Sequence, residues 1–239
     1  MTLARFSSFA IVAALVCGAV ARADDTKPIR HLVYSFDVTL TSNLAQQSYA
    51  GTSQATGSNG DRGQIIVDVL QVQPDTGIVV RISESARNTR SAEPTTCVTY
   101  GNGQFICETD KKINEEEYTL LRLLGKNFVN RAQLDAKHHW MYGTDSAASA
   151  ETSDYTIDSD KNGILGIALS RQQRVKGAQG YTATTEGKLT YNERMSVPLS
   201  DTEDTVTRAE GGASYNRFEQ QISLNLVSDS MQPQAAQAH

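Results

Sequence analysis

Three oxygen-bearing side chains at alternate positions, Asp158, Asp160 and Asn162, stand just before Gly163. This spacing matches the first half of a calcium-binding loop, in which alternate oxygen ligands converge and glycine allows a sharp turn. The twelfth position of such a loop is Leu169 instead of glutamate, so the bidentate ligand is missing. Two interpretations stay open: a weak calcium site at these three residues, or the Asn-Gly turn of a β-hairpin.

The adjacent histidines His138 and His139 are a second pair of metal-ligand types. Neighbouring side chains of a strand point to opposite faces, so the two imidazoles cannot readily bind one zinc ion. Trp140 follows them and is the only tryptophan of the chain. We expect it to anchor a strand in the core rather than to stack on a ligand.

Signatures of catalysis are absent from the sequence. The chain has no G-x-S-x-G elbow, no P-loop and no G-x-G-x-x-G motif. The formal net charge is −5, and Arg171, Arg174 and Lys176 are expected at solvated strand positions, so nucleic acid is not an expected partner. We therefore expect a non-catalytic protein without a cofactor, apart from calcium at the loop described above.

Cys97 and Cys107 are the only cysteines left once the expected signal peptide, which contains Cys17, is cleaved. An exported chain meets oxidants, so this pair predicts a disulfide. A three-residue loop at Gly101-Asn102-Gly103 places the two cysteines opposite each other across a hairpin, where their Cβ atoms lie close enough for a disulfide. A two-residue Asn102-Gly103 turn would shift the register by one and break this pairing. The disulfide therefore predicts the longer loop, and two unpaired thiols are the alternative.

Residues 1–23 have the pattern of a secretory signal peptide that is cleaved. Arg5 precedes an apolar stretch over residues 9–20, and Ala21-Arg22-Ala23 forms an A-x-A cleavage site. The apolar stretch is short for a membrane span, so no stable span is expected after cleavage. The sequence therefore predicts export to the periplasm or the extracellular space, a single β-rich domain over 24–228 and a flexible tail over 229–239.

Most of the remaining chain predicts strands. Residues 32–40 are apolar at every second position, which is typical of a strand buried on one face. The polar stretch 42–63 is either a long loop or the twisted, weakly paired end of two strands. Further strands are expected over residues 65–72, 78–82, 154–158, 164–175, 181–197, 202–208 and 215–227. Reversals are expected at 74–77, 162–163, 177–180, 200–201 and 211–212, and such short connections join antiparallel neighbours.

One amphipathic helix is expected over residues 114–125. Asn114 and Glu117 have the spacing of a capping box, and Gly125 is a suitable stop. Its wide apolar stripe needs an apolar surface to cover it. The predicted fold is therefore mainly β: an antiparallel meander that forms a curved sheet, half-barrel or open barrel, with the helix packed on its concave face.

Two functions agree with this predicted fold. The main hypothesis is a structural or protein-interaction role in the envelope or outside the cell, with an unknown envelope protein as partner. The alternative is a periplasmic carrier for an apolar, lipid-like small molecule held between sheet and helix, a plan similar to that of lipoprotein-carrier half-barrels. The residues expected to line such a cavity are Phe36, Val38, Val80, Ile82, Leu121, Leu124, Ile167 and Leu189.

Overall fold

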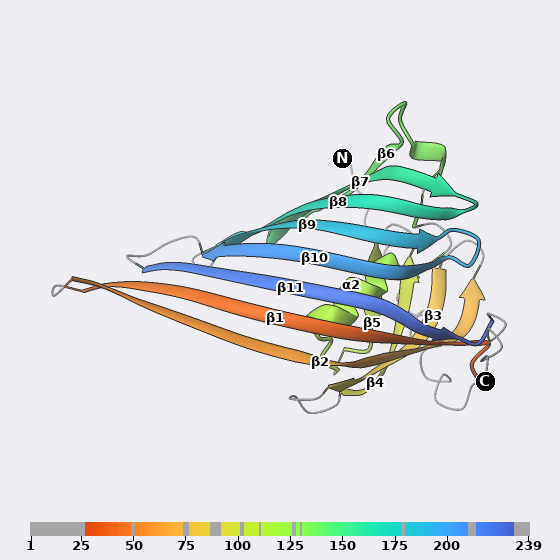
Figure 1. Ribbon diagram of the computed structural model, residues 1–239, viewed down its shortest axis with the longest axis horizontal. Coiled ribbons are helices and arrows are strands. Elements are labelled where there is room, and N and C mark those ends of the chain that lie inside the picture. Colours follow the sequence, from red (N-terminus) through yellow and green to blue (C-terminus); the bar gives the residue numbers. More distant parts are fainter. Residues whose placement is uncertain are drawn as a thin grey trace, which may run out of the picture.

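The protein folds as one antiparallel sheet of eleven strands with a short helix against it (Figure 1). The computed structural model describes residues 27–48, 51–73, 77–86, 92–100, 103–109, 111–125, 128–129, 131–177, 180–209 and 214–231. The expected signal peptide, and the part of the expected tail after Met231, lie outside these ranges.

The strands follow one another along the chain as an up-and-down meander. They are β1 (Arg30–Ser48), β2 (Gly51–Gln73), β3 (Gly77–Ala86), β4 (Ala92–Tyr100), β5 (Gln104–Cys107), β6 (His139–Asp145), β7 (Ser149–Lys161), β8 (Ile164–Val175), β9 (Tyr181–Asn192), β10 (Val197–Ala209) and β11 (Ser214–Asp229). Helix α2 (Glu115–Leu123) and the 3₁₀ turn η1 (Arg131–Gln133) lie between β5 and β6.

The order of strands in the sheet is β5-β4-β3-β2-β1-β11-β10-β9-β8-β7-β6. The first and last strands of the chain, β1 and β11, therefore meet in the middle of the sheet. β5 and β6 are its two edges, and the segment that carries α2 leads from one edge to the other. This arrangement confirms the predicted antiparallel meander with one helix.

The structure decides between the two alternatives for residues 42–63 and corrects one expected reversal. The polar stretch 42–63 belongs to β1 and β2, which stay paired as far as Ser48 and Gly51, so the paired-strand alternative holds. The expected reversal at Ser200-Asp201 is wrong, because both residues lie within β10. The chain turns earlier, between Asn192 and Val197, and the expected strand over 181–197 ends at that turn.

The core has two main apolar clusters, and α2 contributes to both. Leu120, Leu121 and Leu124 join the cluster built on β1–β4 and β10–β11, whereas Leu123 joins the cluster of β6–β9. All four leucines are at most 1% exposed. Burying a leucine side chain stabilises a fold by about 1.5–3 kcal/mol, so the helix holds both halves of the curved sheet together.

The ends of α2 follow the sequence signals. Asn114 precedes the helix in an extended conformation, and its backbone N–H donates to the Glu117 carboxylate at 3.0 Å. The reciprocal contacts of a capping box are present. After the helix, Gly125 has a φ of +117°, a conformation that residues with a side chain rarely adopt. None of the helices in the described ranges is long and apolar enough to cross a membrane.

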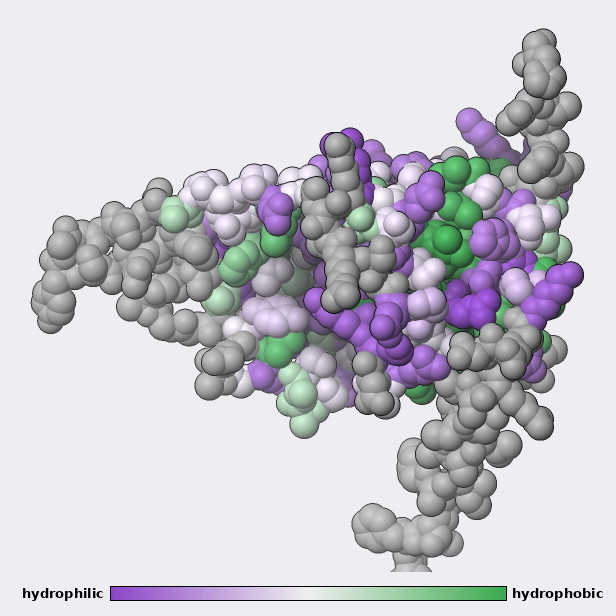
Figure 2. All heavy atoms as spheres, turned by 90° about the horizontal axis from the view of Figure 1, so that it is seen from below, coloured by the Kyte–Doolittle hydropathy of each residue, from purple (hydrophilic) through white to green (hydrophobic). Residues whose placement is uncertain are grey.

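The sheet tapers from a wide end to a narrow one. β1, β2, β10 and β11 reach beyond α2 towards the narrow end on the left of Figure 1. Seen from below, hydrophilic and hydrophobic residues are interleaved, and hydrophobic residues gather towards the wide end (Figure 2). Next to α2, side chains of β1 and of β7 to β11 line an open pocket.

Candidate functional site

Two pockets on the helix side of the sheet meet at one ion pair, between Arg122 of α2 and Glu151 of β7. Both of these side chains, and the ring of Tyr118, line both pockets. The Arg122 guanidinium also lies over the Tyr118 ring, 4.8 Å from its centre. The ion pair therefore divides one concave region into two compartments.

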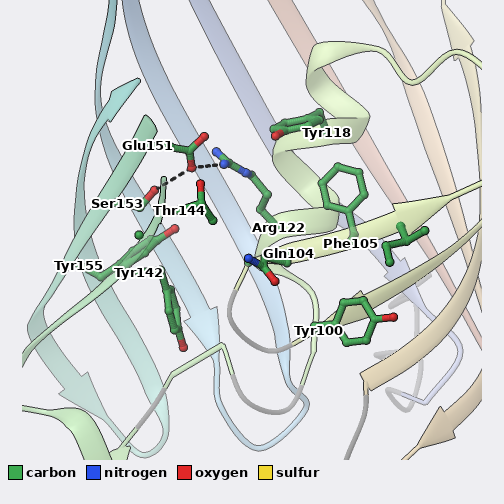
Figure 3. Close-up of a pocket in the computed structure, with 13 residues that line it drawn as sticks. Tyr100, Gln104, Phe105, Tyr118, Arg122, Tyr142, Thr144, Glu151, Ser153 and Tyr155 are labelled. Atoms are coloured by element: carbon green, nitrogen blue, oxygen red, sulfur yellow. Dashed lines mark hydrogen bonds and ion pairs between the residues drawn. The ribbon is translucent and has the colours of Figure 1, made fainter. Parts of the chain in front are cut away.

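The first compartment has a volume of about 350 Å³ and is rich in aromatic side chains. Figure 3 shows Tyr142 and Tyr155 on one side of it, with Tyr118, Phe105 and Tyr100 on the other. The rings of Phe105 and Tyr118 meet edge to face at 4.9 Å. Burial raises the pKa of the Tyr142 hydroxyl to about 12, so this group stays neutral and donates to the Phe128 carbonyl at 3.0 Å.

The second compartment, of about 540 Å³, lies between α2 and the long strands β8–β11 and β1. Its walls combine hydroxyl groups with apolar side chains: Thr185, Thr205 and Thr207 lie among Leu40, Ala183, Phe218 and Ile222. The hydroxyls of Thr185 and Thr205 are 2.8 Å apart and hydrogen-bonded. This lining is amphipathic along its length.

A row of charged groups continues from the dividing ion pair under the helix. The Ser153 hydroxyl lies 3.4 Å from a Glu151 oxygen and accepts a hydrogen bond from Arg171 Nε at 3.3 Å. Arg171 in turn donates two hydrogen bonds to Glu203, at 3.0 and 3.1 Å. Arg171 and Glu203 are 8% and 2% exposed. The expectation that Arg171 is solvated is therefore wrong, because its guanidinium is paired inside the curve of the sheet.

Buried carboxyl groups stand at two places near this row. Asp201 is 1% exposed, and its two side-chain oxygens have no hydrogen-bond partner among the residues that the structure describes. Burial, and next the neighbouring Glu203 carboxylate, raise its pKa well above the usual range. Beside the start of α2, burial and the facing Glu116 carboxylate raise the pKa of Glu84 to about 8. The Glu84 carboxyl group is therefore neutral in the folded protein below about pH 8, and burial favours the neutral form of Asp201 in the same way.

The eight residues expected to line an apolar cavity do not line either compartment. Seven of them are at most 4% exposed and belong to the two main clusters, and Val38 packs against the first cluster. Phe36 also borders an open pocket with Arg62 and Ser223. The eight residues are therefore packed in the core, and the open space between α2 and the sheet is lined by other side chains.

The calcium candidate forms the turn of the hairpin β7–β8. Asn162 and Gly163 have positive φ angles of 57° and 81°, which a type I′ turn requires. Asp160 accepts hydrogen bonds from the Gly163 N–H and from Arg131, both at 3.2 Å, and Asp158 is exposed. Within the described ranges, no group of three or more His, Cys, Asp or Glu side chains is placed to hold a metal ion.

Cys97 and Cys107 form a disulfide across β4 and β5, with their Cα atoms 4.0 Å apart. They face each other directly, and Tyr100 faces Gln104, which is the register that the disulfide predicts. Residues 101 and 102 of the expected loop lie outside the described ranges. Trp140 is 1% exposed and stacks on Tyr155 at 5.1 Å, so it anchors β6 in the core as expected.

No family model and no curated protein matches the chain. Among solved structures, a lipovitellin structure described by its lipid–protein interactions is similar over 90% of this chain and 27% of its own, with 10% identity and a TM-score of 0.48. The chain thus spans about a quarter of the length of that lipovitellin chain. A similarity of this extent assigns neither a family nor a ligand.

Proposed function

We propose that this protein is an exported, non-catalytic binding protein that holds an amphipathic small molecule on the concave side of its sheet. The observation that carries the proposal is the pair of compartments on either side of Arg122 and Glu151. One compartment is lined by aromatic rings, the Arg122–Glu151 ion pair lies between the two, and the other compartment is lined by hydroxyl and apolar groups. Concave sites with apolar walls and a few placed polar groups are the usual form of small-molecule sites.

The lining indicates how such a ligand lies. An apolar body fits against Phe105, Tyr118 and Tyr142, since aromatic rings offer large apolar surfaces at little entropic cost. A polar or charged group of the ligand then reaches Arg122 and Glu151, which can reorganise their mutual bond to accept it. A wholly apolar ligand would take water away from this ion pair and give it no new hydrogen bonds, which costs free energy.

The first experiment is native mass spectrometry of the protein purified without detergent, followed by titration with two probes, palmitate and lysophosphatidylcholine. The fluorescence of Trp140 reports binding, because this residue stacks on Tyr155, which lines the aromatic compartment. We expect saturable binding of at least one probe at a ratio of one per chain. Absence of saturable binding for both probes would contradict the proposal.

A pair of variants locates the site. Tyr118→Ala removes a ring that lines both compartments and should weaken binding at least tenfold. Met141→Ala is the control, because Met141 is 55% exposed and lies next to inward-facing Trp140 and Tyr142, hence on the other face of β6. Equal weakening by both variants would place the ligand elsewhere.

A further inference from the structure

The two edges of the open sheet border the same pocket. Residues 103–106, in and next to β5, and residues 142–144 of β6 line the aromatic compartment from opposite sides (Figure 3). Yet β5 and β6 are the two ends of the strand order, and the described residues include no pairing between them. The sheet therefore curls until its edges face each other across a gap.

The number of strands decides how the two edges run relative to each other. Every neighbouring pair in the sheet is antiparallel. With eleven strands, the first and the last of the order, β5 and β6, then run in the same direction. One further strand that runs the opposite way could pair with both edges in the antiparallel manner of the rest of the sheet.

The hydrogen-bond alternation shows which groups of β6 point into the gap. The bonds from Ile157 N–H to the His138 carbonyl and from Ser146 N–H to the Ser149 carbonyl show that the even-numbered residues pair with β7. The backbone groups of Met141 and Gly143 therefore point away from β7. The corresponding carbonyl of His139 is not available to another strand, because it accepts a hydrogen bond from the Asp135 N–H at 3.0 Å.

The same alternation holds for β5. Glu108 N–H donates to the Thr96 carbonyl at 3.1 Å, so the even-numbered residues of β5 bond to β4. The backbone groups of Phe105 and Cys107 point to the open side. Both edges thus present N–H and C=O groups towards the gap, and for Met141 and Gly143 the described chain supplies no partner there. Such edges are the surfaces at which extended peptides add to a sheet.

We propose that an extended segment of a partner protein adds as a twelfth strand between β5 and β6. Its inward side chains are apolar, because they meet Phe105, Tyr118 and Tyr142. Its outward side chains include lysine or arginine. On the outer side, Met141 is 55% exposed, and Ile106, which also borders the aromatic compartment at the edge of the sheet, is exposed to the same extent. The aliphatic part of a lysine covers such residues while its charge stays in water.

Charge on the outer side of β6 and β7 favours the same segment. Asp154 lies directly opposite Met141 in the β6–β7 pairing. Its side chain is 41% exposed and lies 3.2 Å from His139 Nε2. Asp145, at the end of β6, forms an ion pair with Lys176 at 2.9 Å, yet its side chain is 77% exposed. A positive charge on the outward side of the added strand is attracted to these carboxylates, and the effect weakens as salt is added.

The test uses a labelled nine-residue peptide of alternating lysine and valine, with blocked ends, measured by fluorescence anisotropy. Two control peptides carry the same charge: one has the residues in scrambled order, and one has N-methyl groups on the backbone of alternate residues. We expect the alternating peptide to bind at least tenfold more tightly than either control. Equal binding of all three would show attraction by charge alone and would overturn the proposal.

Two variants of one residue test the edge itself. Gly143→Pro removes the outward N–H, and proline is tolerated at an edge position whose N–H is not part of the ladder. Gly143→Ala keeps the N–H, and the added Cβ makes only an ordinary contact of 3.5 Å with the Glu151 carbonyl oxygen. We expect the proline variant to lose at least tenfold in peptide affinity and the alanine variant to bind as the unchanged protein does.

Hydrogen exchange on the unchanged protein keeps the test independent of how the variants fold. The bound peptide should slow exchange of the backbone N–H groups of Phe105, Met141 and Gly143, whereas the ladder N–H groups of β8 and β9 should exchange as before. Protection confined to other elements would overturn the proposal. The added strand and the proposed small molecule meet the same Phe105, Tyr118 and Tyr142 side chains, so they would compete for the aromatic compartment. Separate titrations with the peptide and with palmitate or lysophosphatidylcholine let either proposal fail while the other stands.

Discussion

Arg171 of β8 reaches across β9 to Glu203 of β10, and the two side chains share two hydrogen bonds at 3.0 and 3.1 Å. The strand between them contributes Gly187 beside Glu203. A Cβ added there would lie 3.3 Å from Glu203 Cγ and 2.9 Å from the Thr202 carbonyl oxygen. The absence of a side chain at Gly187 thus gives the glutamate room to turn towards its partner.

Breaking this pair should destabilise the protein. Glu203→Gln leaves the Arg171 guanidinium buried without its counter-charge, and loss of one partner of a buried ion pair costs about 3–5 kcal/mol. Urea unfolding followed by circular dichroism measures the loss. Asp204→Asn changes the exposed neighbour on the same strand and should alter the free energy of unfolding by less than about 0.5 kcal/mol. Equal, small effects of both changes would contradict the role of the pair.

Stability should fall as the pH rises from about 5 to 8, in part because of Glu84. Its pKa of about 8 lies above the ordinary 4.5, so the folded protein keeps a proton that the unfolded chain has lost in this range. The free energy of unfolding therefore decreases with rising pH. Glu84→Gln mimics the neutral acid, and its stability relative to the unchanged protein should increase from pH 5 to pH 8.

Comparison of the two proteins at each pH removes the contribution of other groups. Asp68 and Asp229 act in the opposite direction at lower pH. Burial is the largest single effect on each and raises its pKa, but the hydrogen bonds and charges of His31 and Arg81 at Asp68, and of Arg30 at Asp229, together outweigh it and lower the pKa. Glu115→Gln, an exposed change in the first turn of α2, is the control and should leave the pH profile unchanged. A Glu84→Gln profile parallel to that of the unchanged protein would contradict the prediction.

Reduction of the disulfide should lower the free energy of unfolding by about 2–3 kcal/mol, the range expected for a loop that joins residues ten positions apart. Thermal unfolding with and without a reducing agent measures the shift. The double variant Cys97→Ala, Cys107→Ala should unfold at the temperature of the reduced protein and should not respond to the reducing agent. Unfolding of the oxidised protein at that same temperature would show that the bond does not stabilise the fold.

The substitution Leu121→Ala should lower the free energy of unfolding by about 2–5 kcal/mol, because it leaves a cavity where α2 meets the sheet. Leu121→Met keeps the volume and should cost less than about 1.5 kcal/mol. Chemical unfolding of the two variants measures the difference. If Leu121→Ala kept full stability, the interface between helix and sheet would have to be loosely packed, in disagreement with the 1% exposure of this side chain.

Sequence patterns predicted the strands, the helix and the hairpin that depend on residues close together in the sequence. Alternation predicted β1 and β8, the capping signals predicted α2, and the spacing of Cys97 and Cys107 predicted the register of their hairpin. The reversal after β9 was missed because residues 193–196 contain neither glycine nor proline, whereas Ser200-Asp201 has the composition of a turn. Aspartate is common in turns and rare inside strands, so the sequence did not indicate that Asp201 is a buried residue of β10. Only the structure shows this position.

The charged row was missed for a different reason. Arg171 follows Leu165, Ile167 and Leu169 at every second position, so alternation alone places it on the buried face. Its charge argued for a solvated position, and the partner that makes burial tolerable lies on a strand that is not its neighbour. The register of two successive hairpins decides that Arg171 and Glu203 meet, and this information is not local in the sequence.

The pairing of β1 with β11 also decides when the sheet can form. Leu32 faces Asp229 in that pairing, so the middle of the sheet joins the two most distant strands of the chain. As the chain is synthesised, β1 to β5 can pair early, but the other side of β1 stays an open edge until β11 arrives. Contacts of this range make folding slow. A chain that stops before Ser214 therefore presents the β1 edge to other molecules, and aggregation at this edge competes with folding until the last strand is in place.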